Sequence, residues 1–383
     1  MQARQRVGLS GPSPQQGSGV PRDGSFLSLS QAAKEGDLNC VDASLRAGSA
    51  VDQRDENNYT PLQLAIKNGH FAVVERLLSY NANLSVVTPN KNSTLLHLAV
   101  EAGCPDVLTL LADVAKAHIN QQDSCGWTPL MIATQWPDPA LCSILLNVTG
   151  IDVNLTNVYH QSALWLATTY DSKGVFERLL HCEDIDVNIA DVYGSTPLME
   201  VVRNGTNDHL NQLLNNRGIK INLQDKSYQT ALMLAIEHNK TEMFERLLAF
   251  SGHDFSLRNS YYQTALQMAV KSENLNFVQK LMAKSHSDIN ATDYDGNTAL
   301  HMAACAGNQA IVEQLLTAEG INVTLKNRAG EDAQHCAVSL DHINTNLVII
   351  GYMIKHNISS LADGEGDDEI AIDSRGATPT PLA

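Results

Sequence analysis

A repeat of constant length constrains the fold of this chain more than any other feature of its sequence. A residue able to cap a helix recurs at one register, which we call the capping column: Thr60, Thr94, Thr128, Ser162, Thr196, Thr230, Thr264, Thr298 and Asp332. Eight successive steps of equal length are very hard to obtain by chance. A fixed period of this size is typical of a solenoid, in which each repeat buries its apolar face against its neighbours.

Two further columns keep the same register and indicate what each repeat folds into. A small residue such as Ala65 follows the capping column by five positions, and an apolar residue such as Leu77 follows it by 17. The side-chain oxygen of Thr, Ser or Asp caps a helix N-terminus, and Pro61 directly after it suits the first helical turn. The pattern predicts two short helices per repeat, with a tight turn ahead of each capping residue, where Asp or Asn recurs.

The sequence at the capping column also carries a family resemblance. Residues 60–65 read Thr-Pro-Leu-Gln-Leu-Ala, residues 94–99 read Thr-Leu-Leu-His-Leu-Ala, and residues 128–133 read Thr-Pro-Leu-Met-Ile-Ala. The chain therefore resembles the ankyrin-repeat family, which has a Thr-Pro-Leu-His-x-Ala signature and a period of about 33 residues. The resemblance covers residues 26–360 and implies an all-α solenoid of about ten helix-turn-helix units with β-hairpin fingers.

This resemblance divides the chain into three parts. Residues 1–25 are rich in Gly, Pro, Ser and Gln and are predicted to be disordered. Residues 26–360 form the array, with an N-terminal capping repeat, eight internal repeats and a C-terminal capping repeat. Residues 361–383 hold six acidic residues and a single base, Arg375, and are predicted to be a disordered acidic tail.

Composition and motifs exclude several classes of function. The net charge of −16 argues against a nucleic-acid partner. The apolar run 347–354 is too short to cross a bilayer, and no apolar segment follows the first methionine as in a signal peptide, so we expect a protein of the cytoplasm or nucleus. Seven widely spaced cysteines without a Cys-x-x-Cys motif predict reduced thiols and no metal site. No catalytic or nucleotide-binding motif is present, so we expect neither an enzyme nor a cofactor.

The resemblance implies binding through the hairpin tips and the inner helices, and aromatic residues concentrate in those columns. We predict a concave groove over repeats four to six, built by Trp127, Trp136, Tyr159, Tyr170, Tyr193 and Arg203. Exposed Trp, Tyr and Arg are frequent interface anchors. Scattered surface aromatics are also ordinary, so both interpretations stay open. Substituting Trp136 or Tyr159 by Ala is expected to weaken binding and to leave thermal stability almost unchanged.

The predicted function is non-enzymatic recognition of a protein, as a scaffold or adaptor that acts as a monomer. The acidic net charge makes a basic or amphipathic protein the expected partner. Three alternatives remain. A substrate adaptor of a ubiquitin ligase needs a recruiting box, which residues 341–360 do not show. A toxin-type effector needs a secretion or catalytic segment, for which residues 1–25 leave little room. An inhibitor-type regulator of a signalling or transcription protein is the third.

Several single columns lead to further expectations. His97, His301 and His335 share a position three residues after the capping column, and we expect them to brace the turns. Glu200 replaces an apolar residue and is predicted to reach solvent at the rim. The stretch Trp136-Pro137-Asp138-Pro139 is predicted to end the first helix of its repeat early.

An asparagine column offers a possible modification site. It comprises Asn120, Asn154, Asn188, Asn222 and Asn290. The resemblance implies substrates of an asparaginyl hydroxylase, which makes Asn154, Asn188 and Asn222 candidates for hydroxylation. The competing interpretation, which we favour, is that these side chains support the backbone near the fingers.

Overall fold

The computed structural model describes residues 27–170, 173–284 and 289–358. In these residues the chain forms 20 α-helices and one short 3-10 helix. It divides into two compact blocks, Met1–Ile185 and Asp186–Ala383, which we call the N-terminal and the C-terminal block and describe separately. The segments 1–25 and 361–383 lie outside the described residues, so their disorder stays a prediction.

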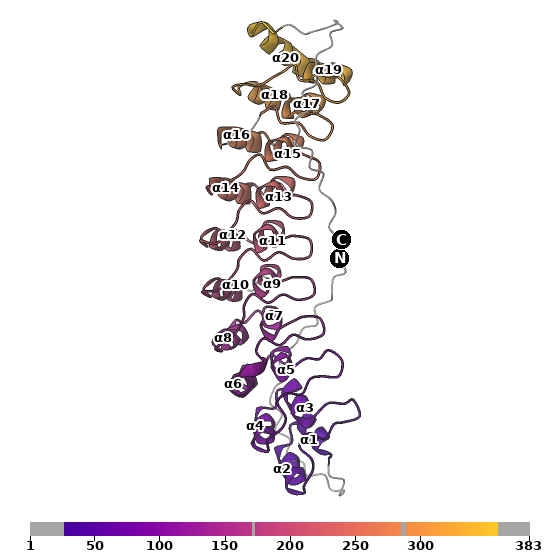
Figure 1. Ribbon diagram of the computed structural model, residues 1–383, viewed down its shortest axis with the longest axis vertical. Helices are drawn as coiled ribbons and strands as arrows, with labels where there is room; N and C mark the ends of the chain where they lie inside the picture. The colour runs from indigo at the N-terminus through magenta and orange to yellow at the C-terminus, as the bar shows by residue number, and fades with distance from the viewer. Residues whose placement is uncertain (1–26, 171–172, 285–288, 359–383) are drawn as a thin grey trace, which may run out of the picture. The chain divides into compact units, whose positions relative to one another are not determined.

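The helices come in pairs, one pair for each repeat. The N-terminal block holds α1 (Leu29–Glu35), α2 (Leu38–Arg46), α3 (Pro61–Lys67), α4 (Phe71–Ser79), α5 (Leu95–Glu101), α6 (Pro105–Val114), the 3-10 helix η1 (Lys116–His118), α7 (Pro129–Ala133), α8 (Ala140–Leu146), α9 (Ala163–Thr169) and α10 (Lys173–Leu180). The C-terminal block holds α11 (Pro197–Asn204), α12 (Asn207–Leu214), α13 (Ala231–Glu237), α14 (Thr241–Ala249), α15 (Ala265–Lys271), α16 (Leu275–Lys284), α17 (Ala299–Cys305), α18 (Gln309–Leu315), α19 (Ala333–Ser339) and α20 (Ile343–Lys355). Within each block, odd-numbered helices pack on odd-numbered ones and even-numbered on even-numbered ones (Figure 1).

The capping column explains where the first helix of each repeat begins. Each of its nine residues accepts a hydrogen bond from the backbone N–H three residues later. At α3 the bond is reciprocal, because the Thr60 N–H also donates to the Gln63 side chain at 3.0 Å. An N-cap of this kind contributes roughly 0.5–2 kcal/mol, so the repeated Thr, Ser or Asp fixes these helix starts through local chemistry.

The apolar columns form a continuous core inside each block. Leu77, Leu145 and Leu247 are all fully buried, as the register of the repeat predicts. Larger side chains also pack against each other between the second helices of adjacent repeats. The ring centroids of Phe244 on α14 and Phe277 on α16 lie 4.2 Å apart. The predicted all-α array of about ten helix pairs is therefore confirmed. None of the described helices has both the length and the apolar character needed to span a membrane.

The fingers expected as β-hairpins contain little regular β-structure in the described residues. Their β-structure is limited to one isolated bridge, between Thr156 and Ser162. The finger at Asp123 is a short hairpin turn held by its first residue: the Asp123 N–H donates to the Trp127 carbonyl at 2.8 Å, and its carboxylate accepts from the N–H groups of Cys125 and Trp127, at 2.8 and 2.9 Å. The capping residue Thr128 follows at once and starts α7, so too few residues remain to extend a ladder.

Candidate functional site

Neighbouring fingers are joined into a row by backbone hydrogen bonds. In the C-terminal block, an N–H in one finger donates to a carbonyl of the finger before it at 2.9–3.2 Å: Lys226 to Tyr193, Ser260 to Ser227, Tyr294 to Tyr261 and Arg328 to Asp295. Because these bonds recur at each junction, the finger tips hold fixed positions relative to one another. The row therefore offers a preformed surface within this block.

The histidine column braces the fingers, as expected. The Thr94 N–H donates to Nδ1 of His97 at 3.1 Å, so Nε2 carries the ring proton and donates to the Trp127 carbonyl at 2.8 Å. His301 repeats this arrangement with the Glu331 carbonyl at 3.0 Å. Burial lowers the pKa of both imidazoles and keeps them neutral. His335 differs, since its Nδ1 bonds the Asp332 carboxylate and its side chain is 60% exposed.

The side chains of the asparagine column bond the backbone ahead of the next finger and thereby join consecutive repeats. Asn222 donates through Nδ2 to the Gly252 carbonyl at 2.8 Å and accepts through Oδ1 from the Asp254 N–H at 3.1 Å. Asn188 does the same with Gly218 and Lys220. The other members of the column also donate to a carbonyl 30 residues later: Asn120, Asn154 and Asn290. This geometry supports the structural interpretation, and hydroxylation of Asn154, Asn188 and Asn222 stays a prediction.

The N-terminal block holds four of the six residues predicted to form the groove. Tyr159 and Tyr170 are exposed, at 57% and 46%. Trp127 is half-buried in its finger, where its carbonyl receives the bond from His97. Trp136 is half-buried as well, and its ring lies so close to Gly103 that a Cβ there would be 2.5 Å from it.

Trp136 occupies a place that other repeats fill with a smaller side chain. His70 lies in the same way over Gly36, and His342 over Gly307. The two prolines after Trp136 accompany an early end of the helix, as predicted: α7 has five residues, whereas α5 has seven. Trp136 thus has a packing role between consecutive repeats, which the sequence interpretation as a free binding anchor did not include.

The C-terminal block holds the remaining two residues, and they differ in character. Tyr193 is 70% exposed at the tip of its finger. The Arg203 guanidinium donates to the Ser195 hydroxyl at 2.6 Å and to the Asp225 carboxylate at 2.7 Å. Since the Asp225 side chain is only 6% exposed, this ion pair fixes Arg203 between two fingers. Tyr193 is the more accessible of the two for a partner.

Glu200 corrects another expectation. The carboxylate predicted at the rim is 7% exposed and lies on the buried side of α11. Its Oε1 accepts a hydrogen bond from Asn204, one helical turn later, at 2.7 Å. A local partner on the same helix therefore allows the carboxylate to occupy the otherwise apolar column.

The most exposed aromatic residues of the C-terminal block follow its finger tips. We call them the tyrosine row: Tyr193, Tyr228, Tyr261, Tyr262 and Tyr294, which are 47–70% exposed. Cations lie over three of the rings: Arg258 over Tyr262, Lys271 over Tyr261 and Arg328 over Tyr294, at 4.5–5.6 Å from the ring centroids. The groove hypothesis, centred on repeats four to six, included only the first member of this row.

Two members of the tyrosine row have an unusual backbone. Tyr228 and Tyr262 have φ values of 58° and 64°, in the left-handed region that bulky residues rarely adopt. Four other repeats place glycine at the same position, with φ of 73–80°: Gly126, Gly194, Gly296 and Gly330. A Tyr where the turn favours Gly is the sequence signal that could have identified this row.

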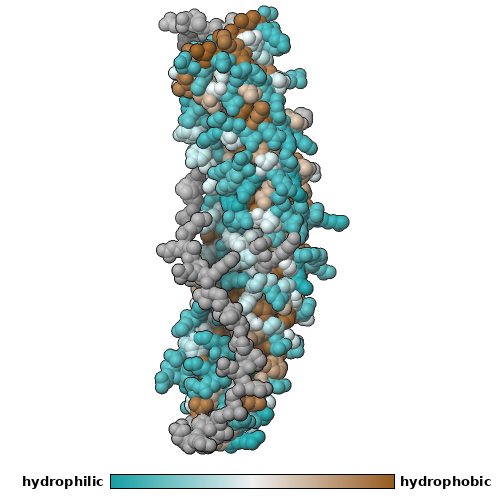
Figure 2. Space-filling view, turned by 180° about the vertical axis from the view of Figure 1, so that it is seen from behind, coloured by the Kyte–Doolittle hydropathy of each residue, from teal (hydrophilic) through white to brown (hydrophobic). Residues whose placement is uncertain are grey.

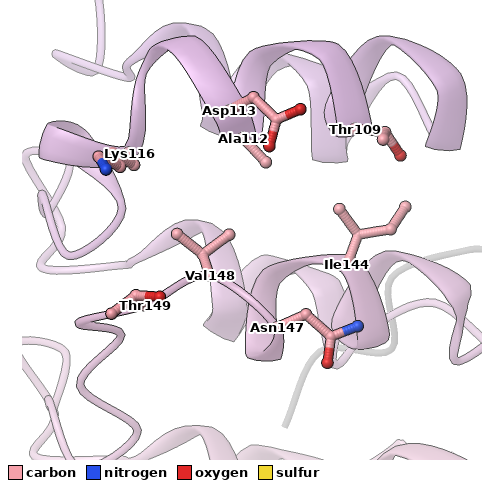
Figure 3. A pocket seen from close by; sticks show the side chains of 8 residues that line it. All are labelled: Thr109, Ala112, Asp113, Lys116, Ile144, Asn147, Val148 and Thr149. Carbon is pink, nitrogen blue, oxygen red and sulfur yellow. The ribbon is translucent and has the colours of Figure 1, made fainter.

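The described surface also has a cleft of about 380 Å³ between α6 and α8. Figure 3 shows Ile144 and Val148 pointing from the α8 side toward α6, which contributes Thr109, Ala112 and Asp113. The lining mixes single polar and apolar groups and brings together no pair of acids or nucleophiles. Among the described residues, no group of three His, Cys, Asp or Glu side chains is placed to hold a metal ion.

Comparisons with known proteins agree with this architecture. A family model described as ankyrin repeats (3 copies) matches residues 29–123, 112–191, 177–259, 198–293, 232–327 and 266–361. Among solved structures, the ankyrin repeat domain of Bcl-3, described as a unique member of the IkappaB protein family, aligns with a TM-score of 0.53 and 28% identity. That alignment covers 59% of this chain and 99% of the Bcl-3 chain.

Curated relatives match over shorter segments. Inversin of Canis lupus familiaris is 32% identical over 108 residues, which are 27% of this chain and 9% of inversin. Alpha-latrotoxin-Lh1a of Latrodectus hasselti is 31% identical over 85 residues, which are 22% of this chain and 6% of the toxin. The match thus spans less than a tenth of these two relatives. Because the repeat model matches most of the chain and the helix pairs follow its register, this protein belongs to the ankyrin-repeat family.

Proposed function

We propose that this chain is a non-enzymatic protein-binding module, a scaffold or adaptor, that contacts its partner through the tyrosine row. Ankyrin repeats generally serve as protein-binding modules. The observation that carries the proposal is the left-handed backbone of Tyr228 and Tyr262. A side chain retained at a position that favours glycine needs a reason outside the turn itself.

The free-energy balance of the isolated chain does not supply that reason. A left-handed conformation costs a residue with a Cβ roughly 1–2 kcal/mol. Tyr228 and Tyr262 are 47% and 58% exposed, so burial within the chain offsets little of this cost. Strained backbone of this kind is concentrated at binding sites, and tyrosine is among the residues that dominate interface energetics.

The charges along the row indicate the chemistry of the partner. Arg258, Lys271 and Arg328 stand beside the tyrosine rings, although the whole chain has a net charge of −16. We therefore propose an amphipathic segment that meets the rings with apolar side chains and the cations with carboxylates. Of the two partner types expected from the sequence, basic or amphipathic, the basic one fits this row less well. Tyr159 and Tyr170 are further candidate contacts in the N-terminal block.

The experiment that tests the proposal is affinity capture with the Tyr228→Gly/Tyr262→Gly variant. The substitution restores the residue that four other repeats carry, so we expect unchanged or slightly higher thermal stability. We expect at least a tenfold loss of affinity for the captured partner, since each anchor contributes on the order of 1 kcal/mol or more. Tyr80→Ala, at a 40% exposed site in the N-terminal block, is the matched control. Equal affinity of the double variant and the wild type would exclude the tyrosine row.

A regulator of a signalling or transcription protein is the second candidate role. The similarity to the Bcl-3 domain over 99% of that chain favours it. The two roles are distinguished by mass spectrometry of the proteins that the wild type captures and the double variant does not. Ligase subunits would indicate a ubiquitin-ligase adaptor, and a transcription or signalling protein would indicate a regulator.

A further inference from the structure

The three cations of the tyrosine row have no carboxylate partner among the described residues. Arg258, Lys271 and Arg328 lie over tyrosine rings, and none of them takes part in an ion pair there. Elsewhere in the same block, Arg246 pairs with the Glu242 carboxylate at 2.7 Å. The row therefore offers positive charge to a carboxylate that comes from outside the described fold.

Acidic residues of the same fingers are largely engaged within the fold. The Asp225 carboxylate binds Arg203, and the Asp293 carboxylate accepts from the N–H groups of Asp295 and Asn297, at 3.0 and 2.8 Å. Asp295 stays exposed in its finger. The face of the C-terminal block drawn in Figure 2 is mainly hydrophilic, and its larger apolar area lies at the upper end, over α19 and α20. A ligand that lies along this block therefore needs polar as well as apolar groups.

The chain itself carries a segment with the chemistry that the row requires. Residues 363–373, which we call the acidic segment, read Asp-Gly-Glu-Gly-Asp-Asp-Glu-Ile-Ala-Ile-Asp and lie outside the described residues. They contain six carboxylates, no base and two isoleucines, Ile370 and Ile372. Carboxylates pair with guanidinium and ammonium groups, and aliphatic side chains can pack on exposed rings. The acidic segment therefore matches the amphipathic partner proposed for the row.

The end of α20 brings the chain close to the fingers. The loop between α19 and α20 consists of residues 340–342, and two helices joined by so short a loop are antiparallel. Since α19 begins directly after the last finger, α20 ends on the finger side of the block. His356 lines a cleft together with Gly320, from which the preceding repeat continues to the first residue of its finger, Asn327. The same number of residues leads from His356 to Asp363, so enough chain is present for the acidic segment to begin at the row.

The acidic segment is also long enough to reach all three cations. Arg328 and Arg258 belong to fingers that are two repeats apart. Packed helices lie 8–10 Å from each other, so this separation is roughly 16–20 Å. An extended chain advances about 3.3 Å per residue, so the 11 residues of the segment span roughly 35 Å. The segment can therefore follow the row from the last finger past both arginines.

We propose that the acidic segment binds along the tyrosine row of its own chain and competes there with the partner. Its carboxylates pair with Arg258, Lys271 and Arg328, and its isoleucines pack on the exposed rings. The inference rests on the proposed function, because it assigns an internal competitor to the same surface. A short tether gives an effective concentration on the order of 1 mM. A segment with a Kd of about 0.1 mM in trans then weakens partner binding roughly tenfold.

Zero-length cross-linking of the full-length chain tests the contact. A carbodiimide joins a carboxylate to a lysine amine with loss of water, and mass spectrometry of the digested monomer band identifies the joined peptides. We expect the acidic segment to be joined to Lys271. Lys240, which is exposed in the turn between α13 and α14, is the control and should be joined far less. Equal yields at the two lysines, or no product at Lys271, overturn the proposal.

A competition experiment tests whether the row is occupied. The probe is a labelled synthetic peptide of residues 361–383, and fluorescence anisotropy measures its affinity for the full-length chain. In the amide variant, each Asp of the acidic segment is replaced by Asn and each Glu by Gln. This variant is expected to bind the probe about tenfold more tightly than the wild type, because its own segment no longer competes. The gain should shrink as salt is added, since the contact is ionic.

Substitutions in the amide variant locate the contact. Arg258→Gln/Arg328→Gln is expected to abolish the tenfold gain, while circular dichroism and thermal melts check the fold. Lys240→Gln/Lys284→Gln removes the same charge at two exposed sites away from the fingers and should keep the gain. A probe that binds the wild type and the amide variant equally overturns the proposal, and so does a gain that the control substitutions remove as well as the arginine substitutions do.

Partner capture separates this inference from the proposed function. Tyr228→Gly/Tyr262→Gly placed in the amide variant tests the partner contact without a competing acidic segment. If capture depends on these tyrosines while the probe and the cross-links ignore the row, the proposed function stands and the inference falls. If the probe binds the row but capture does not depend on the tyrosines, the proposed function falls instead.

Discussion

Glu200 allows the repeat pattern to be tested by a substitution that should stabilise the protein. Its position is filled by leucine, isoleucine or methionine in the repeats on either side, and those side chains are buried: Leu64, Leu98, Ile132, Leu166, Leu234 and Met268. Glu200 is equally buried, with the hydrogen bond from Asn204 as a polar contact. Replacing it by Leu restores the apolar column, and the exposed Asn204 amide can bond to water instead.

The expected gain follows from two terms. Burying a leucine side chain stabilises a protein by about 1.5–3 kcal/mol, an upper range because the unfolded chain is partly compact. Removing a buried carboxylate avoids a desolvation cost of roughly 1–3 kcal/mol. The lost bond to Asn204 and imperfect packing oppose these terms, so we expect Glu200→Leu to raise the free energy of unfolding by about 1–3 kcal/mol. Glu200→Gln keeps a polar group in the same place and should gain much less.

Urea and thermal unfolding of the full chain measure this effect. For a block of about 200 residues, each 1 kcal/mol corresponds to roughly 2–4 °C in the unfolding midpoint. Both variants are compared at one pH and with the same ionic strength. A Leu variant that is no more stable than the wild type would show that the carboxylate makes a favourable contribution that the buried apolar column cannot replace.

Two further predictions concern the packing between repeats. Burial lowers the pKa of His97 and His301 below the ordinary value of 6.5, so their contribution to stability is complete above that pH and declines as the pH falls below it. Thermal melts from pH 7.5 to 5.5 should therefore show a fall in the unfolding midpoint that is smaller in His97→Gln/His301→Gln than in the wild type. Gln is a suitable replacement because Gln63 and Gln267 already cap the equivalent helices. An equal fall in the variant and the wild type would contradict this prediction. Trp136→Ala should lower the free energy of unfolding by about 1–3 kcal/mol, because the ring that packs on Gly103 is lost. The loss is smaller than for a fully buried Trp, since Trp136 is only half-buried. Trp136→His, which imitates His70, should recover much of that loss in urea unfolding, and an Ala variant as stable as the wild type would contradict the packing role.

The fold could be predicted from the sequence because its signals are local. Thr60 caps the helix that begins one residue later, and Leu77 is buried by a neighbour of the same kind. Such features recur in each repeat, so one correct interpretation serves the whole array. The turns of the fingers could also be predicted from local residues. Extended strands do not form there, because α7 begins directly after Thr128 and leaves too few residues for a ladder.

The candidate site was less predictable, because its contacts join residues of different repeats. The ion pair of Arg203 depends on Asp225 in the next finger, and the packing of Trp136 depends on Gly103 in the repeat before. Neither contact has a signature in the residue alone. By contrast, Tyr228 and Tyr262 stand in a column that otherwise holds Gly, Asn or His, and comparing that column across repeats would have indicated them.

The asparagine bridges give a reason why the repeats that carry them keep a constant length while their side chains vary. Each amide spans from its own loop to two backbone groups, 30 and 32 residues further along. One inserted residue between Asn222 and Gly252 would shift both targets by about 3.5 Å and break the bridge at once. Natural variants of this chain are therefore expected to gain or lose whole repeats, and to tolerate single-residue insertions mainly outside these spans.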